Sequence, residues 1–184
     1  MSEHFRFSVK LPKTITHQQR PRDCDALLDT FLAQVAGLGE RLGCLLVQLP
    51  PSLAFDADNA APFLRALRER HSGPVALEPR HASWCAALAD ALLQAWQVAR
   101  VLADPQVNEA GRGPGGFAGT VYVPLHGSPR MYYSPYERSL PDALVVRLEA
   151  AGESDASIRC IFDNTAERSA VADALYTTQR LAVR

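Results

Sequence analysis

Six short apolar runs, separated by longer segments with helical periodicity, constrain the fold of this chain more than any other sequence feature. The runs are FRFSVKL (5–11), CLLVQL (44–49), VALEPR (75–80), VARVLA (98–103), VYVPLHG (121–127) and IRCIFDN (158–164). Runs of this length match strands, and the intervening segments are long enough for crossover helices. Because the middle runs are almost continuously Val, Leu and Ile, they are typical of parallel strands that helices cover. The pattern predicts one α/β domain over residues 1–184.

The intervening segments also contain signals for helix starts. The expected starts are Asp23 or Asp25, the stretch before Phe63, then Ser83, Ser139 and Thr165. The first helix should run through Leu38 to Leu42 and end at Gly43, because apolar residues recur there at three- and four-residue steps. In the third, Trp84, Leu88 and Leu92 should face the sheet, and in the last, Val171 and Leu175. The glycine-rich stretch GRGPGG (111–116) is expected to be a surface loop.

Composition narrows the class of protein. The chain has 184 residues, of which 47% are hydrophobic and 21% charged, and a formal net charge of −1. This predicts a globular domain with a sizeable core, and it argues against a nucleic-acid or lipid-surface partner held by overall charge. No secretion signal or apolar stretch of bilayer length is evident, and the four cysteines are scattered without a C-x-x-C pair. We therefore expect a cytoplasmic protein without a membrane partner.

Polar residues occupy the carboxyl ends of the predicted strands. Side chains alternate across a strand, so Glu78 and Arg80 must share one face. Ligand sites of α/β sheets and barrels lie where the carboxyl ends of parallel strands meet. The residues expected to converge there are Lys10, Gln48, Glu78, Arg80, Asp104, His126 and Asn164.

Such a set is suited to acid–base chemistry. Glu78 is the candidate general base, His126 the acid, and Lys10 a catalytic cation that stabilises an oxyanion together with Arg80. Candidate substrate-binding residues are Arg80, Gln48, His81, Asp104, Asn164 and Tyr133. A structural reading stays open beside this one, in which Glu78 and Arg80 are a buried ion pair and His126 supports a turn. Tyr132 and Tyr133 either line a pocket or cover the loop.

A metal site is the second possibility among enzymes. Glu78, Asp104, His126 and Asp163 offer mixed nitrogen and oxygen ligands, but no short-range ligand motif such as H-E-x-x-H is present. No metal is therefore predicted, and the sequence indicates no particular cofactor.

Several motifs together resemble those of the YecE-like family, also called domain of unknown function 72. They are FRFSVKLPKTITH, RLGCLLVQLPPS, VALEPRHASW, VYVPLHG followed by YYS, and IFDNT, in the family's order and over nearly the whole chain. The resemblance implies a TIM-like β/α barrel whose biochemical activity is not established. Three positions depart from the family pattern. Pro79 stands where an aromatic is usual, Pro124 where an arginine is usual, and Asp163 where an asparagine is usual.

The resemblance also implies that this barrel is incomplete. The family usually has a further βα unit before the FRFSVK strand, and six strands are counted where a barrel has eight. Two sheet edges would then be free, and free edges invite pairing. Three explanations stay open: a fragment of a longer chain, self-association through the edges, or a natural open sheet.

Three functions therefore compete. The first is an enzyme that performs acid–base chemistry on a small polar or anionic substrate, similar to a sugar or a phosphate. The second is a non-catalytic ligand-binding or assembly module. The third is phosphodiester or nucleic-acid processing, which rests only on Lys10, Arg80 and Arg130.

Overall fold

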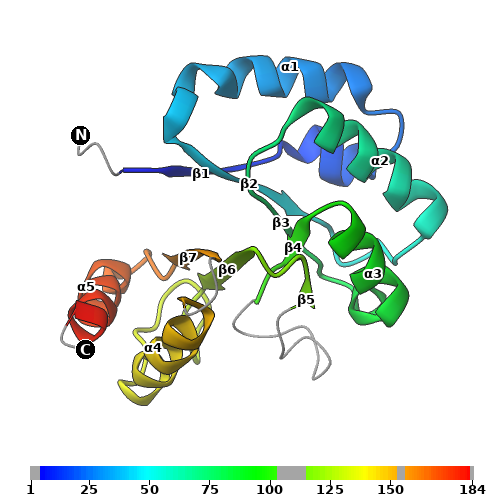
Figure 1. The fold of residues 1–184 in the computed structure, drawn as a ribbon. Coiled ribbons are helices and arrows are strands. Elements are labelled where there is room, and N and C mark those ends of the chain that lie inside the picture. The colour runs from blue at the N-terminus through cyan, green and yellow to red at the C-terminus, as the bar shows by residue number, and fades with distance from the viewer. Residues whose placement is uncertain (1–4, 103–114, 153–155, 183–184) are drawn as a thin grey trace.

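Parallel strands alternate with helices along the chain (Figure 1). The computed structural model describes residues 5–102, 115–152 and 156–182. Strands β1 (Phe7–Lys10), β2 (Leu42–Gln48), β3 (Val75–Glu78) and β4 (Val98–Arg100) pair in parallel and in chain order, and β6 (Thr120–Leu125) pairs in parallel with β7 (Ser157–Phe162). The Leu102 N–H donates to the Tyr122 carbonyl at 3.0 Å and joins the two sheets. The predicted alternation of parallel strands and helices is confirmed, although the described strands do not close into a ring.

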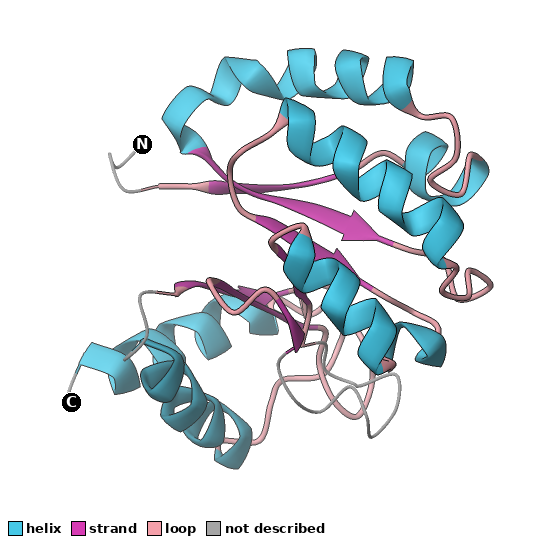
Figure 2. Cartoon of the chain, turned by 45° about the vertical axis from the view of Figure 1, so that its right-hand side comes forward, coloured by secondary structure: helices cyan, strands magenta, loops and turns pink. Residues whose placement is uncertain are grey.

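Helices cover one face of these strands. Helices α1 (Asp25–Val35), α2 (Ala57–Arg70) and α3 (Ala87–Ala95) lie over the first sheet, whereas α4 (Ser139–Gly152) and α5 (Ser169–Ala182) lie beside β6 and β7 (Figures 1 and 2). Shorter turns are η1 (Thr14–Gln18), η2 (Ala36–Arg41) and η3 (Ala82–Cys85). Within the described residues, no helix has both the length and the hydropathy to cross a bilayer.

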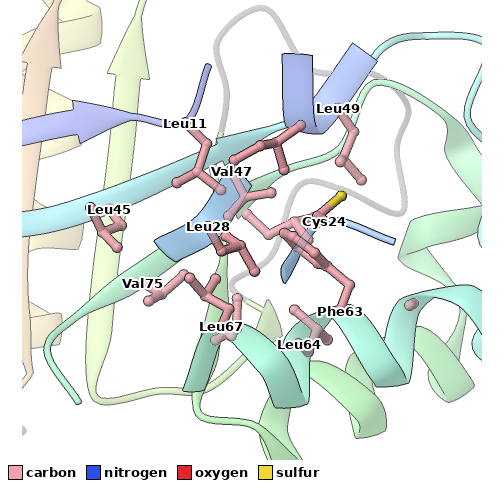
Figure 3. Packing of buried hydrophobic residues seen from close by; sticks show 14 of the residues in the cluster. Leu11, Cys24, Leu28, Leu45, Val47, Leu49, Phe63, Leu64, Leu67 and Val75 are labelled. Atoms are coloured by element: carbon pink, nitrogen blue, oxygen red, sulfur yellow. The ribbon is translucent and has the colours of Figure 1, made fainter. Parts of the chain in front are cut away.

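The main hydrophobic core lies between the first sheet and its helices. Leu45, Val47 and Val75 point from the strands toward Leu28, Leu64 and Leu67 on the helices (Figure 3). We call this helix-covered side the outer face of the sheet. Because side chains alternate along a strand, Leu46, Ala76 and Tyr122 lie on the opposite, inner face, in a smaller cluster with Cys44 and Val101.

Three sequence expectations about helices were wrong. The first helix ends at Val35, because η2 follows with Gly39 at a φ of 51°, and Leu42 and Gly43 belong to β2 instead. Leu88 is 65% exposed, because η3 precedes α3 and shifts its phase, so Ala89 and Leu93 face the sheet.

The last helix shows the third difference. Val171 and Leu175 are exposed, while Ala170, Asp173 and Thr177 are buried. The buried face of α5 is therefore partly polar, and hydrophobic periodicity alone assigns the wrong face. The helix also begins at Ser169 rather than Thr165.

Two glycines of the GRGPGG stretch form a strand rather than a loop. Gly115 and Gly116 make β5 (Gly115–Gly116), which pairs antiparallel with β4. A side chain at Gly115 would collide with the guanidinium of Arg100, which lies against the outer face in an ion pair with Asp90. Residues 111–114 lie outside the described residues.

Burial of Cys44 on the inner face should make the protein less stable at alkaline pH. Burial raises the pKa of this thiol from 9.0 to about 11. Between these values the unfolded chain loses the proton while the folded protein keeps it, so the free energy of unfolding falls as pH rises. This group alone accounts for at most about 2–3 kcal/mol of the fall. Urea unfolding at about pH 8 and about pH 10.5 measures this fall in the free energy of unfolding. The fall should be smaller in Cys44→Ala than in the wild type, while Cys85→Ala should show the same fall as the wild type. Equal falls in all three proteins would contradict the assignment.

Candidate active site

A row of polar side chains crosses the inner face at the carboxyl ends of β1, β2 and β3. Gln48 and Glu78 are direct partners in the parallel register. The Gln48 Nε2 donates to Glu78 Oε2 at 2.9 Å, and the exposed Lys10 Nζ donates to Gln48 Oε1 at 3.5 Å. The charge of Lys10 also reaches His17 in η1, where burial, then Lys13 and Lys10, lower the pKa of the ring. The strand ends thus connect a lysine to a carboxylate through one amide.

Glu78 is the most enclosed member of the row. Its residue is 1% exposed, and its Oε1 lies 2.5 Å from Arg80 Nη2 in an ion pair. The two charges lie together, as strand parity predicts. A buried carboxyl group needs polar partners to offset the loss of water, and Arg80 and Gln48 provide them.

His126 faces Glu78 from the other sheet. It follows β6 directly, and its Nδ1 lies 3.1 Å from Oδ2 of Asp163, which follows β7. Because a carboxylate accepts and does not donate, this contact places a proton on Nδ1. The Nε2 atom is then directed toward Glu78, 3.9 Å from Oε1, which is too long for a hydrogen bond.

Unpaired polar atoms concentrate at this point. In the described part of the chain, the buried atoms Arg80 Nε and His126 Nε2 have no hydrogen-bond partner, and Glu78 Oε1 has only its ion pair with Arg80. Most buried polar groups in proteins are paired, and exceptions often mark functional sites. With its proton on Nδ1, His126 accepts at Nε2, and the Glu78 carboxylate also accepts, so a hydroxyl between them would donate its proton to one of the two. The geometry therefore suits a substrate hydroxyl.

The loop after β6 brings aromatic side chains to the same place. The ring of Tyr132 lies edge-on to His126, with 5.5 Å between centroids. Arg130 stacks on Tyr133, 3.6 Å from its centroid. The loop turns sharply at Gly127, whose φ is 93° and where a Cβ would lie 2.8 Å from the Ser134 carbonyl oxygen. A larger residue at this position would displace the loop from His126.

Comparison with known proteins identifies the chain's relatives. The family model described as "Protein of unknown function DUF72" matches residues 1–184. The chain belongs to the DUF72 family. A DUF72 family protein (TM1631) from Thermotoga maritima MSB8 superposes with a TM-score of 0.81 at 23% identity, over 97% of this chain and 74% of that protein. A second, EF0366 from Enterococcus faecalis V583, gives a TM-score of 0.80 at 21% identity, over 100% and 81%. At these identities the likeness concerns the fold.

A curated DUF72 relative is similar over a shorter stretch. The UPF0759 protein YecE of Escherichia coli K12 is 43% identical over 49 residues, which are 27% of this chain and 18% of YecE. The matched segment thus spans less than a fifth of that relative.

Other predicted site residues of this DUF72 chain have structural partners. Asn164 is fully buried, and its Nδ2 donates to Asp173 Oδ2 at 2.7 Å and to the Ser134 carbonyl at 3.1 Å. His81 precedes η3, where its Nδ1 accepts from the Ser83 N–H at 3.2 Å. These contacts place Asn164 beside α5 and His81 at a helix cap. Asp104 lies outside the described residues.

Three further residues lie at the site. From the sequence, Asp163 is considered only as a possible metal ligand, whether Tyr132 lines a pocket is left open, and Asp173 is not considered. Asp163 pairs with His126, Tyr132 lies against the same ring, and Asp173 holds Asn164 and the loop below it. A parity count extended to β7 would have found Asp163, since it is opposite His126 in the continued register. No local signal marks Asp173. Within the described residues, no group of three or more His, Cys, Asp or Glu side chains is arranged to hold a metal.

Proposed function

We propose that the six parallel strands and their helices are part of a TIM-like β/α barrel, with its active site at the carboxyl ends of the strands. Support comes from the strand order, from the helices on the outer face, and from the polar row on the inner face. In such barrels the catalytic residues come from the ends of several different strands.

The protein is an enzyme that performs acid–base chemistry on a small polar or anionic substrate, such as a sugar or sugar phosphate. The observation that carries this proposal is that His126 Nε2 and Glu78 Oε1 face each other, 3.9 Å apart and both buried, while Arg80 forms an ion pair with the same oxygen. Glu78 acts as base, and His126 moves a proton through Nε2 while Asp163 fixes its ring at Nδ1. Arg80 and Lys10 stabilise negative charge that develops on the substrate oxygen.

A ligand screen by thermal shift tests this proposal. The panel contains neutral sugars and their phosphate esters, and a ligand at about 100 times its Kd should stabilise the protein by about 2.7 kcal/mol. That stabilisation should disappear in Glu78→Gln and His126→Gln. Glu69→Gln, the same change at an exposed position of α2, should keep it. A ligand whose stabilisation survives in both site variants binds elsewhere, and the assignment of this site would then be wrong.

Turnover separates an enzyme from a binding module. With a ligand identified, the enzyme proposal expects conversion by the wild type and its loss in Glu78→Gln at saturating ligand. A ligand that binds at the site and is never converted would support the non-catalytic module instead.

We also propose that the protein is cytoplasmic. All four cysteines are free thiols, which suits a reducing compartment.

A further inference from the structure

A cavity lies behind the candidate active site, on the outer face of the same strand ends. It has a volume of about 260 Å³, and Leu49 and Leu77 contribute to its wall. Leu49 follows Gln48 and Leu77 precedes Glu78, so alternation along β2 and β3 directs these leucines away from the active-site row. The two sites therefore share strand ends but are separated by the thickness of the sheet.

Hydrogen bonds hold the walls of this cavity in place. Trp84 is 4% exposed, its Nε1 donates to the Leu53 carbonyl at 3.0 Å, and the Phe55 ring packs edge-on against it at 5.0 Å. Across the opening, the Arg20 guanidinium donates to the Ser52 carbonyl at 2.8 Å and to Ser52 Oγ at 3.1 Å. The cavity is thus formed before any ligand arrives, which lowers the entropic cost of binding.

Charge at the opening favours an anion. Arg20 and Arg22 line it together with one carboxylate, Asp56. Asp56 is already engaged as the cap of α2, where it accepts from the Asp58 N–H at 3.0 Å and from the Asn59 amide. Arg22 is exposed, and within the described residues it forms no ion pair. Two guanidinium groups therefore face one carboxylate, and that carboxylate already accepts hydrogen bonds from the first turn of α2.

We propose that this cavity binds a small carboxylic acid with an aromatic or similarly flat apolar body. The body packs against Trp84, Phe55 and Phe63, and the carboxylate lies at the opening beside Arg22. The volume is below the roughly 300–1,000 Å³ of sites for drug-sized molecules, which restricts the ligand to one ring and a short acid chain.

Tryptophan fluorescence tests the proposal directly. The chain has two tryptophans, so Trp96→Phe leaves Trp84 as the only tryptophan, and excitation beyond the tyrosine absorption band makes its emission specific. Titration with phenylacetate should give a saturable change in Trp84 emission, and the wild type should show a matching rise in Tm. The neutral analogue 2-phenylethanol should bind about fivefold more weakly, because that factor corresponds to the loss of a partly exposed ion pair. For the same reason, Arg22→Gln should bind phenylacetate about fivefold more weakly than the wild type does. Ala60→Leu, which fills the cavity at a buried position of α2, should abolish the response.

Three of the outcomes that would overturn the proposal concern the cavity itself. They are no saturable response in fluorescence or Tm, equal binding of the acid and the alcohol, and a response that persists in Ala60→Leu. Glu78→Gln should leave phenylacetate binding unchanged, so that failure of this proposal and failure of the active-site proposal give different results. Loss of the phenylacetate response in Glu78→Gln would place the probe at the active site and also contradict the proposal.

Discussion

Replacing Leu64 with alanine should reduce the free energy of unfolding by about 2–5 kcal/mol, the range for removing a large aliphatic side chain from a packed core. Leu64 is fully buried on α2 and belongs to the cluster between that helix and the outer face of the sheet (Figure 3). Its loss leaves a cavity that the neighbouring side chains fill only in part, since protein cores are packed as densely as organic crystals.

The matched control is the same substitution on another helix. Leu88 in α3 is 65% exposed, so Leu88→Ala should change the free energy of unfolding by no more than about 0.5 kcal/mol. Urea unfolding followed by circular dichroism measures both variants. If Leu88→Ala were as destabilising as Leu64→Ala, the helix phase described for α3 would be incorrect, because Leu88 would then face the sheet.

Asp173→Ala should be similarly destabilising, although it removes few atoms. Asp173 is 2% exposed, and its Oδ2 accepts from Asn164 Nδ2 at 2.7 Å and from the Tyr136 N–H at 3.2 Å. The variant removes one acceptor from each of these two buried donors, and each lost acceptor costs about 1–3 kcal/mol, so the expected loss is about 2–6 kcal/mol. The same urea experiment measures it.

Asp142→Ala provides the comparison for Asp173. Asp142 also has two partners, Tyr176 and Arg180, but its side chain is 41% exposed. Water replaces those partners, so the expected loss is about 0–1 kcal/mol. Asp173→Ala should also weaken the binding of any ligand at the candidate active site, because Tyr136 and Asn164 anchor the loop that carries Tyr132. Equal stability losses in the two variants would show that the Asp173 network does not hold this loop.

Strand-level features were accessible from the sequence because they depend on local chemistry. Apolar runs predicted the six parallel strands, and alternation within VALEPR placed Glu78 beside Arg80 on one face. Both inferences need only the geometry of an extended backbone. The same reasoning placed Lys10 and Gln48 at adjacent strand ends, where they form a hydrogen bond.

Features that depend on tertiary packing were not accessible. The phase of α3 is set by the short helix before it, and the polar face of α5 is buried because Asp173 meets partners from a distant loop. The cavity behind the site forms between loops that are about 30 residues apart in sequence, as the contact from Arg20 to Ser52 shows. Helical periodicity is read within one segment, so it does not predict contacts between a helix and a distant loop or between two loops.

The junction between the two sheets has a consequence for how the protein opens. The Leu102–Tyr122 backbone hydrogen bond connects β4 to β6, and the candidate site has Glu78 on one side of this junction and His126 on the other. Proteins often exchange their amide hydrogens in contiguous cooperative units, and a junction of this kind is a natural boundary between two of them. If residues from Thr120 onward form a unit that opens before the first sheet does, His126 leaves Glu78 each time it opens. The His126–Glu78 arrangement and the protection of the β6 amides would then be lost together, well before the core around α2 unfolds.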